Sequence, residues 1–238
     1  MKFLILLLIT LNCYAHDITA QSWIVTDEHG KMIAGDNEDR VMPIASITKL
    51  ITVITVLKSG ADIDEKIKTE SFGTVSRRQL IDMALIRSNN MAADQLCRSY
   101  DLGYKMCIED MNYTMHTLGM EDSRVFDSTG LNNKNRSTAL DLVKLLNEAG
   151  KYPEIVSASS QANTKIKIRK RWVLFKNTNP LIGQRQDIIV SKTGFTRAAG
   201  GCLVMLMSTD KGMRSVVVLG SQNTHTRIPE AEFIADTY

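Results

Sequence analysis

Apolar and polar positions alternate in different ways along the chain, and the differences predict its elements. Near the start, short strand-like runs at 22–26 and 31–35 flank a polar sequence at 27–30, which predicts a β-hairpin. The run from Ser46 to Lys58 has apolar residues at helical spacing: Ile47, Leu50, Ile51, Ile54 and Leu57. Its β-branched residues would permit a strand, but its length and the closing Gly60 favour a buried helix.

Two further helices have capping signals at their N-termini. Ser76 and Gln79 fit a capping box for a helix that runs to about Arg87, and a second helix-like stretch follows at 91–100. Thr138, with Asp141 three residues later, opens another helix. That helix has leucines and an alanine on one face and ends at Gly150.

After residue 165 the pattern becomes strand-like, with runs at 166–175, 187–193, 202–208 and 213–220. Strands at both ends with helices between them predict one sheet made from the two termini. We expect residues 20–40 and 165–225 to form this sheet, around a helical region at about 46–150. The fold class is therefore α/β, of the α+β kind.

Composition limits the range of functions. The chain has 238 residues, of which 44% are hydrophobic and 23% charged, which is enough for one sizeable core. The net charge of +3 is too small to indicate a nucleic-acid partner. No repeat or low-complexity linker divides the chain, so we expect a single domain over residues 16–238.

Residues 1–15 have the pattern of a signal peptide. Lys2 is followed by an apolar run at 3–11 and by a small-residue site ending at Ala15. The run is too short to span a bilayer easily, so we expect cleavage after Ala15 rather than an uncleaved anchor. A lipid on Cys13 is a weaker alternative, because the residue before it fits a lipoprotein site poorly. The mature protein is expected to be periplasmic or secreted, without a stable membrane anchor.

Three cysteines remain after such a cleavage, in an oxidising compartment. Cys97 and Cys107 flank an expected turn, and their spacing leaves both a disulfide and two free thiols open. Cys202 lies in an apolar strand and is interpreted as a buried small hydrophobic residue. The cysteines and the four histidines have no metal-ligand spacing, so no metal or other cofactor is expected.

Three short motifs follow one another along the chain: Ser46-Ile47-Thr48-Lys49, Ser88-Asn89-Asn90 and Lys192-Thr193-Gly194. This ordered set is typical of serine acyl-transfer enzymes in which a lysine is the base. The first two motifs each occur a second time, at Ser208 and Ser221. Ser208 lies in a polar turn and Ser221 follows the third motif, so their context excludes both copies.

The similarity extends beyond the motifs, to residues 45–53, 126–131 and 191–204. Over about residues 20–225 the chain resembles the low-molecular-mass penicillin-binding proteins, the serine D-alanyl-D-alanine carboxypeptidases and endopeptidases of peptidoglycan maturation. The stretch around Lys192 most resembles the endopeptidase branch. The resemblance implies a fold of the β-lactamase/transpeptidase-like type, with an antiparallel sheet packed against a helical lobe and the site at their junction.

The resemblance also implies catalytic roles. Ser46 would be the nucleophile, Lys49 its general base and Ser88 the relay that returns the proton to the leaving amine. Residues three apart on a helix share a face, so Ser46 and Lys49 can meet. A serine hydroxyl needs its proton removed, and Lys49 can do this only when neutral. Burial and Lys192, as a second cation, would both lower the pKa of Lys49.

The remaining motif residues would bind the substrate. Asn90 would hold a peptide amide, and Lys192 and Thr193 the carboxylate side of the substrate. Gly194 would leave an edge strand open for the substrate backbone. The backbone N–H groups of Ser46 and Phe195 would form the oxyanion hole. The implied partners are peptidoglycan stem peptides, with β-lactam antibiotics as covalent inhibitors.

Two other functions remain open. A β-lactamase would need a group that hydrolyses the acyl-enzyme rapidly, and the four glutamates between the second and third motifs lack the family context for it: Glu109, Glu121, Glu148 and Glu154. A non-catalytic cell-wall binding protein on the same fold is the second alternative. The motifs do not separate endopeptidase from carboxypeptidase activity.

Neither the histidines nor the basic stretch at 165–171 needs a catalytic role. The histidines fit no Ser-His-Asp arrangement and are expected in loops or on the surface: His16, His29, His116 and His225. The basic and apolar alternation at 165–171 predicts a solvated strand face, or else a contact with an anionic cell-wall polymer. After the last predicted strand we expect no further domain and no membrane-binding helix.

Overall fold

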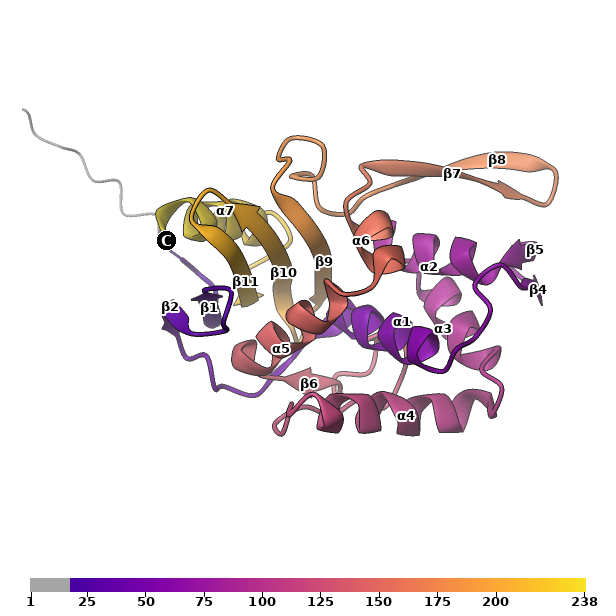
Figure 1. The fold of residues 1–238 in the computed structure, drawn as a ribbon, viewed down its shortest axis with the longest axis horizontal. Helices are drawn as coiled ribbons and strands as arrows, with labels where there is room; N and C mark the ends of the chain where they lie inside the picture. The colour runs from indigo at the N-terminus through magenta and orange to yellow at the C-terminus, as the bar shows by residue number, and fades with distance from the viewer. Residues whose placement is uncertain (1–17) are drawn as a thin grey trace, which may run out of the picture.

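The computed structural model of the chain describes residues 18–238, and the predicted signal peptide lies outside them. Figure 1 shows a twisted sheet beside a group of helices, with a long hairpin along one edge of the helical part. The two parts meet where strand β9 (Ile188–Thr196) passes the start of helix α1 (Thr48–Lys58). The expected α+β architecture is confirmed.

The main sheet has five strands in the order β2-β1-β11-β10-β9, and every neighbouring pair is antiparallel. Its other strands are β1 (Ser22–Thr26), β2 (Met32–Asp36), β10 (Gly200–Thr209) and β11 (Gly212–Ser221). The N-terminal hairpin therefore pairs with the C-terminal strands through β1 and β11, as the sequence predicts. The third motif lies on β9, which is an edge strand.

Both faces of this sheet are covered because its strands alternate between two cores. Ile24 of β1 belongs to the large core shared with the helices, whereas Trp23 and Val25 face the opposite side. There they pack in a second core with helix α7 (Arg227–Thr237), which contributes Ala231 and Ile234. Successive side chains of a strand point to opposite faces, so β1 serves both layers. The pattern of the sequence did not predict α7.

The helical part surrounds α1. Its other members are η1 (Ala45–Ile47), α2 (Arg77–Ile86), α3 (Asn90–Arg98), α4 (Gly103–Thr117), α5 (Ala139–Ala149) and α6 (Pro153–Ser159). Every residue of α1 from Thr48 to Val56 is buried, and apart from Lys49 this run has only apolar side chains and threonines. The Ser76 capping box and the Thr138 cap form as predicted.

Three small antiparallel pairs complete the fold. They are β3 (Met42–Pro43) with β6 (Arg136–Ser137), β4 (Lys66–Thr69) with β5 (Gly73–Ser76), and β7 (Asn163–Ile168) with β8 (Arg171–Lys176).

The last pair corrects the sequence analysis. The strand predicted at 166–175 is two strands, joined by a turn in which Arg169 has φ +54°. Together they form a separate hairpin, so the main sheet begins at Ile188 on this side rather than near residue 165. The turn has no glycine, proline or asparagine, and the basic and apolar alternation continues through it, so the pattern concealed the reversal.

The structure shows which cysteines are paired. Cys97 and Cys107 form a disulfide that joins α3 to α4, with their Cα atoms 5.4 Å apart. Cys202 is a free, buried thiol, as expected. Between residues 18 and 238, no helix is long and apolar enough to cross a membrane.

Candidate active site

The nucleophile candidate Ser46 lies in η1, the tight turn that leads into α1. Ala45 before it has φ +45°, an uncommon conformation for a residue with a side chain. Two glycines make room for this turn. A β-carbon on Gly130 would lie 1.8 Å from the Ala45 carbonyl oxygen, and one on Gly194 would lie 3.0 Å from the Ser46 nitrogen. The turn is therefore held between two backbone segments that approach it closely.

Lys49 is fully buried, and its Nζ has three oxygen neighbours. It lies 2.8 Å from Oγ of Ser46, 2.7 Å from Oδ1 of Asn90 and 2.6 Å from the carbonyl oxygen of Thr129. The amide and carbonyl oxygens can only accept hydrogen bonds. A neutral amine has two N–H groups and one lone pair, so two bonds to these acceptors leave the lone pair for the Ser46 hydroxyl proton.

The electrostatics favour that neutral form. Burial lowers the pKa of Lys49 to about 7, and the Asp127 carboxylate acts in the opposite direction. Lys192 is also buried, and its pKa is well below the ordinary lysine value because of burial first and then repulsion by Lys49 and Arg227. Burial is thus the leading cause at Lys49, and the predicted contribution of Lys192 is not among the causes there. The repulsion between the two lysines lowers the pKa of Lys192 instead.

Ser88 and Asn90 belong to the connection between α2 and α3. Ser88 has φ +58°, and Asn89 caps α3 by accepting a hydrogen bond from the Ala92 N–H. This turn directs Ser88 to Lys192, whose Nζ donates to Oγ of Ser88 at 2.9 Å. Asn90 reaches Lys49 from the first turn of α3. The second motif therefore forms the turn between the two helices and also places Ser88 and Asn90 beside the two lysines.

The third motif lies on β9 with its side chains buried. Nζ of Lys192 donates to the Thr193 carbonyl at 2.8 Å, and the Thr193 hydroxyl lies 2.6 Å from that of Thr178. Gly194 is beside Ser46, as noted above, and Phe195 follows it with a side chain 45% exposed. The structure thus gathers Ser46, Lys49, Ser88, Asn90 and the Lys192 motif into one place.

Two contributors were missed by the sequence analysis. Arg227, at the start of α7, donates from Nη1 to the Gly194 carbonyl at 2.6 Å. It is a third basic side chain near Lys192, besides Lys49, and no motif marked it. Thr129 was missed because its backbone carbonyl, rather than its side chain, contacts Lys49.

The loop that carries Thr129 is fixed by Asp127. Its carboxylate accepts hydrogen bonds from the backbone N–H groups of Thr129, Gly130 and Asn132 at 2.6–2.7 Å. Asp127, Thr129 and Gly130 belong to the stretch at 126–131 that resembles the family. Beside the loop a groove of about 310 Å³ opens, with Asn90 and Thr129 in its wall and the exposed Met91 and Leu131 at its rim.

The expected oxyanion donors belong to neighbouring segments, since Gly194, the residue before Phe195, lies against the backbone at Ser46. The histidines that the structure describes are elsewhere: His29 is in an exposed turn and His116 is on the exposed side of α4. His225 is exposed and His16 lies outside the described residues.

Comparison with known proteins agrees with this arrangement. A profile of the D-alanyl-D-alanine carboxypeptidase family matches residues 10–72 and 65–223. The D-alanyl-D-alanine endopeptidase of Pseudomonas aeruginosa is 36% identical over 90% of this chain and 76% of its own length. The endopeptidase of Escherichia coli K12 is 34% identical over the same shares.

Solved structures show the same fold. Penicillin-binding protein D2 from Listeria monocytogenes in its cefotaxime-bound form is 26% identical, with a TM-score of 0.82 over 92% of this chain and 96% of that one. The Streptomyces K15 DD-transpeptidase is 23% identical, with a TM-score of 0.85 over 92% of this chain and 96% of its own. With a serine and a buried lysine in contact at the centre of this fold, the chain belongs to the D-alanyl-D-alanine carboxypeptidase family of serine hydrolases.

Proposed function

We propose that this enzyme is a serine DD-peptidase of peptidoglycan that cleaves D-alanyl peptide bonds through an acyl-enzyme on Ser46. One observation carries the proposal: Nζ of Lys49 lies 2.6–2.8 Å from Oγ of Ser46, Oδ1 of Asn90 and the Thr129 carbonyl oxygen. A neutral amine that donates to the last two would turn its lone pair to Ser46. A base prepared in this way is what a serine nucleophile requires.

Acylation would proceed in two stages. Oγ of Ser46 attacks the D-alanyl carbonyl carbon while its proton passes to Nζ of Lys49. The backbone N–H groups of Ser46 and Phe195 stabilise the negative oxygen that forms. The C–N bond then breaks, and the proton held by Lys49 passes through the Ser88 hydroxyl to the leaving amine, so Lys49 is neutral again. Nζ of Lys192 holds this hydroxyl in place at 2.9 Å. A water molecule completes the cycle by the reverse steps.

Substrate binding would use the cationic side of the site. Lys192, Thr193 and Arg227 surround Gly194 with two basic side chains and a hydroxyl, which suits the carboxylate at the end of a stem peptide. Asn90 would hold an amide of the acyl-donor peptide at the groove. β-Lactams carry both a reactive carbonyl and a carboxylate, and would acylate Ser46 in the same position, in keeping with the cefotaxime-bound relative.

The endopeptidase relatives support cleavage of cross-links as the principal activity. Residues 16–238 would be one catalytic domain, exported after removal of a signal peptide at 1–15 and working in the periplasm, where its substrate lies.

Two measurements test this function. Intact-protein mass spectrometry with a penicillin should give one adduct, which is absent in Ser46→Ala. Monomeric and cross-linked muropeptides should then be digested separately, and we expect the cross-linked substrates to disappear faster. No adduct and no digestion by the purified protein would exclude the proposal.

A further inference from the structure

The hairpin β7–β8 concentrates positive charge. Residues 163–176 contain six Lys and Arg and no Asp or Glu. Removing these six from the 29 of the whole chain leaves 23, against 26 Asp and Glu, so a chain of net charge +3 has a remainder of −3. Such asymmetry is typical of a segment that meets an anionic partner.

The two faces of the hairpin differ. Antiparallel partners point to the same side, so the register places six residues together on what we call the outer face: Asn163, Lys165, Lys167, Trp172, Leu174 and Lys176. All six are exposed, Trp172 to 69% and Leu174 to 45%. On the inner face Ile166 and Phe175 are buried in the large core. The outer face is thus an apolar pair bordered by lysines.

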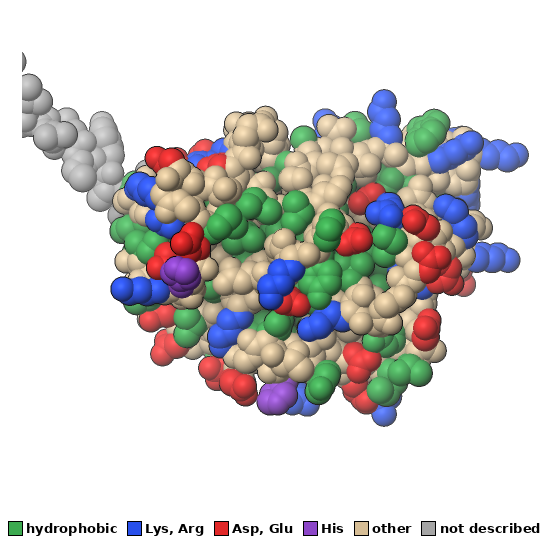
Figure 2. Space-filling model, viewed as in Figure 1, with side chains coloured by type: hydrophobic (Ala, Val, Ile, Leu, Met, Phe, Trp, Pro, Cys, Tyr) green, Lys and Arg blue, Asp and Glu red, His purple; other side chains and the backbone are tan. Residues whose placement is uncertain are grey.

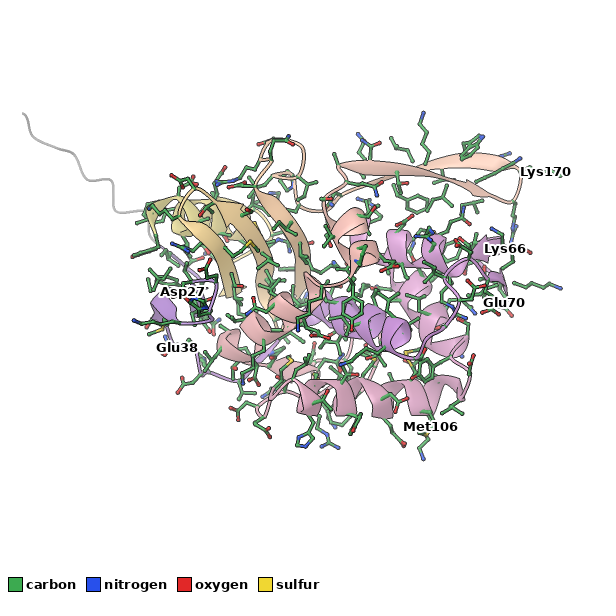
Figure 3. All side chains as sticks on the ribbon, viewed as in Figure 1. Asp27, Glu38, Lys66, Glu70, Met106 and Lys170 are labelled. Carbon is green, nitrogen blue, oxygen red and sulfur yellow. A yellow bond between two sulfur atoms is a disulfide. The ribbon has the colours of Figure 1, made fainter. Side chains whose placement is uncertain are left out.

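The hairpin is held in place at both ends. At its far end, where Figure 3 labels Lys170, the Arg169 guanidinium donates to the Glu70 carbonyl at 2.9 Å. At its root, Thr178 lies two residues after β8, and its hydroxyl contacts Thr193 of the active site at 2.6 Å. Side chains at 176, 174 and 172 therefore form a row about 14 Å long that starts next to the site and leads away from it.

Within the part of the chain that the structure describes, the lysines of the outer face have no acidic partner. Among residues 18–238, no ion pair involves Lys165, Lys167 or Lys176. Figure 2 shows basic side chains projecting around the end of the molecule where the hairpin lies. Lys165 lines a shallow surface pocket with Trp172 and Leu174. An unpaired ammonium group and apolar side chains therefore lie side by side on this face.

We propose that the outer face of this hairpin is a docking surface for the peptidoglycan strand, and holds the enzyme on the polymer through the free carboxylates of its stem peptides. The choice of peptidoglycan as the partner rests on the proposed function, because this is the polymer that the active site would cleave. Lysines would pair with the carboxylates, and Trp172 would cover the apolar faces of the sugars or peptides with its ring.

A membrane fits this surface less well. The residues that would enter a bilayer first, Arg169 and Lys170, are both charged. Trp172 and Leu174 lie along the side of the hairpin between lysines, rather than forming an apolar tip. Interfacial anchors instead separate an apolar face from a charged one.

The test measures binding apart from turnover. Ser46→Ala protein is sedimented with insoluble peptidoglycan sacculi, and its bound fraction is compared with that of Ser46→Ala carrying K165Q/K167Q or Trp172→Ala. We expect each to weaken binding by about five- to tenfold, and binding of the parent to fall with added salt. The matched control K31Q/K211Q removes the same charge from two exposed lysines outside the hairpin and should bind like the parent.

Further measurements distinguish a wrong docking surface from a misfolded variant or a membrane partner. In the background with Ser46 intact, the hairpin variants should react with penicillin at the normal rate, which shows that they fold and keep the site. Equal sacculus binding by the hairpin variants and their parent would overturn the docking surface, as would equal loss in the control. Hairpin-dependent binding to phosphatidylglycerol vesicles without binding to sacculi would overturn it in favour of a membrane. A penicillin adduct at Ser46 in any of these cases leaves the proposed function standing.

Discussion

The Gly130 backbone passes so close to Ala45 that a β-carbon at residue 130 would lie 1.8 Å from the Ala45 carbonyl oxygen. The contact joins the loop that carries Thr129 to the turn that carries Ser46, so it determines how the base and the nucleophile meet. Gly130 also has φ +85°, which a side chain rarely adopts.

Gly130→Ala should therefore both destabilise and inactivate the enzyme. The clash forces the loop or the turn to move, and we expect a loss of about 3 kcal/mol or more in the free energy of unfolding. Gly60→Ala is the matched control, because φ is +75° there but no atom lies within 4 Å of the added carbon. The control should lose about 1 kcal/mol and keep its rate of penicillin acylation. Similar urea midpoints for the two variants would contradict the packing argument.

Acylation should depend on pH through Lys49. Its pKa is lowered to about 7, and only the neutral amine can take the Ser46 proton. Below that pH the lysine is protonated, so the second-order rate of acylation should rise with pH and level off above about 8. Lys49→Arg should abolish it, since arginine stays charged. Lys211→Arg, in the second copy of the first motif, should behave as wild type. A rate that is flat from about pH 5.5 to 8.5 would rule out Lys49 as the titrating base.

Ser88→Ala tests the proton relay. Removing the hydroxyl leaves Lys192 without one of its two hydrogen-bond partners and the leaving amine without its proton donor. We expect peptide cleavage to slow by about 10²–10⁴-fold, with little change in thermal stability. Ser208→Ala, at the excluded copy of the first motif, should leave cleavage unchanged. A Ser88→Ala enzyme within twofold of wild type would remove this residue from the mechanism.

β-Lactam turnover should be slow. Across residues 18–238, no glutamate makes a hydrogen bond to Ser46 or Lys49, and we expect the acyl-enzyme formed with a β-lactam to be long-lived. Nitrocefin should give a burst of about one equivalent per enzyme followed by a slow phase. Sustained rapid hydrolysis would instead identify a β-lactamase.

The disulfide should matter more for stability than for chemistry. It closes a short loop between α3 and α4, and its removal in C97A/C107A should cost about 2–3 kcal/mol of unfolding free energy. Asn90, at the start of α3, would remain in contact with Lys49, so acylation at room temperature should persist. Urea unfolding, with Cys202→Ala as the comparison, measures the difference. Complete loss of acylation in a folded double variant would show that the bond shapes the site.

The sequence predicted the elements whose pattern is repetitive and local. The Ser76 capping box and the apolar helix after Ser46 formed as expected, because each signal lies within a few residues of the element it marks. The single strand predicted at 166–175 was wrong because the turn residue between β7 and β8, Arg169, adopts a positive φ that no glycine announces. Helix α7 was missed because it follows a polar loop and is only weakly amphipathic.

The position of the candidate site was predictable where side chains form it. All eight expected site residues, from Ser46 to Phe195, lie at the junction of sheet and helices. Thr129 and Arg227 could not be predicted from motifs, since one acts through its carbonyl and the other through a contact across 33 positions of sequence. Such contacts depend on the tertiary fold rather than on local spacing.

The nine consecutive buried residues of α1 have a consequence for how the enzyme fails. Amide hydrogens in such a segment exchange with solvent only when the whole molecule opens, whereas exposed loops open separately. We therefore expect the backbone next to the nucleophile to be among the slowest to exchange deuterium. Heating should then abolish penicillin labelling and unfold the protein in one transition, without an intermediate that is folded but inactive.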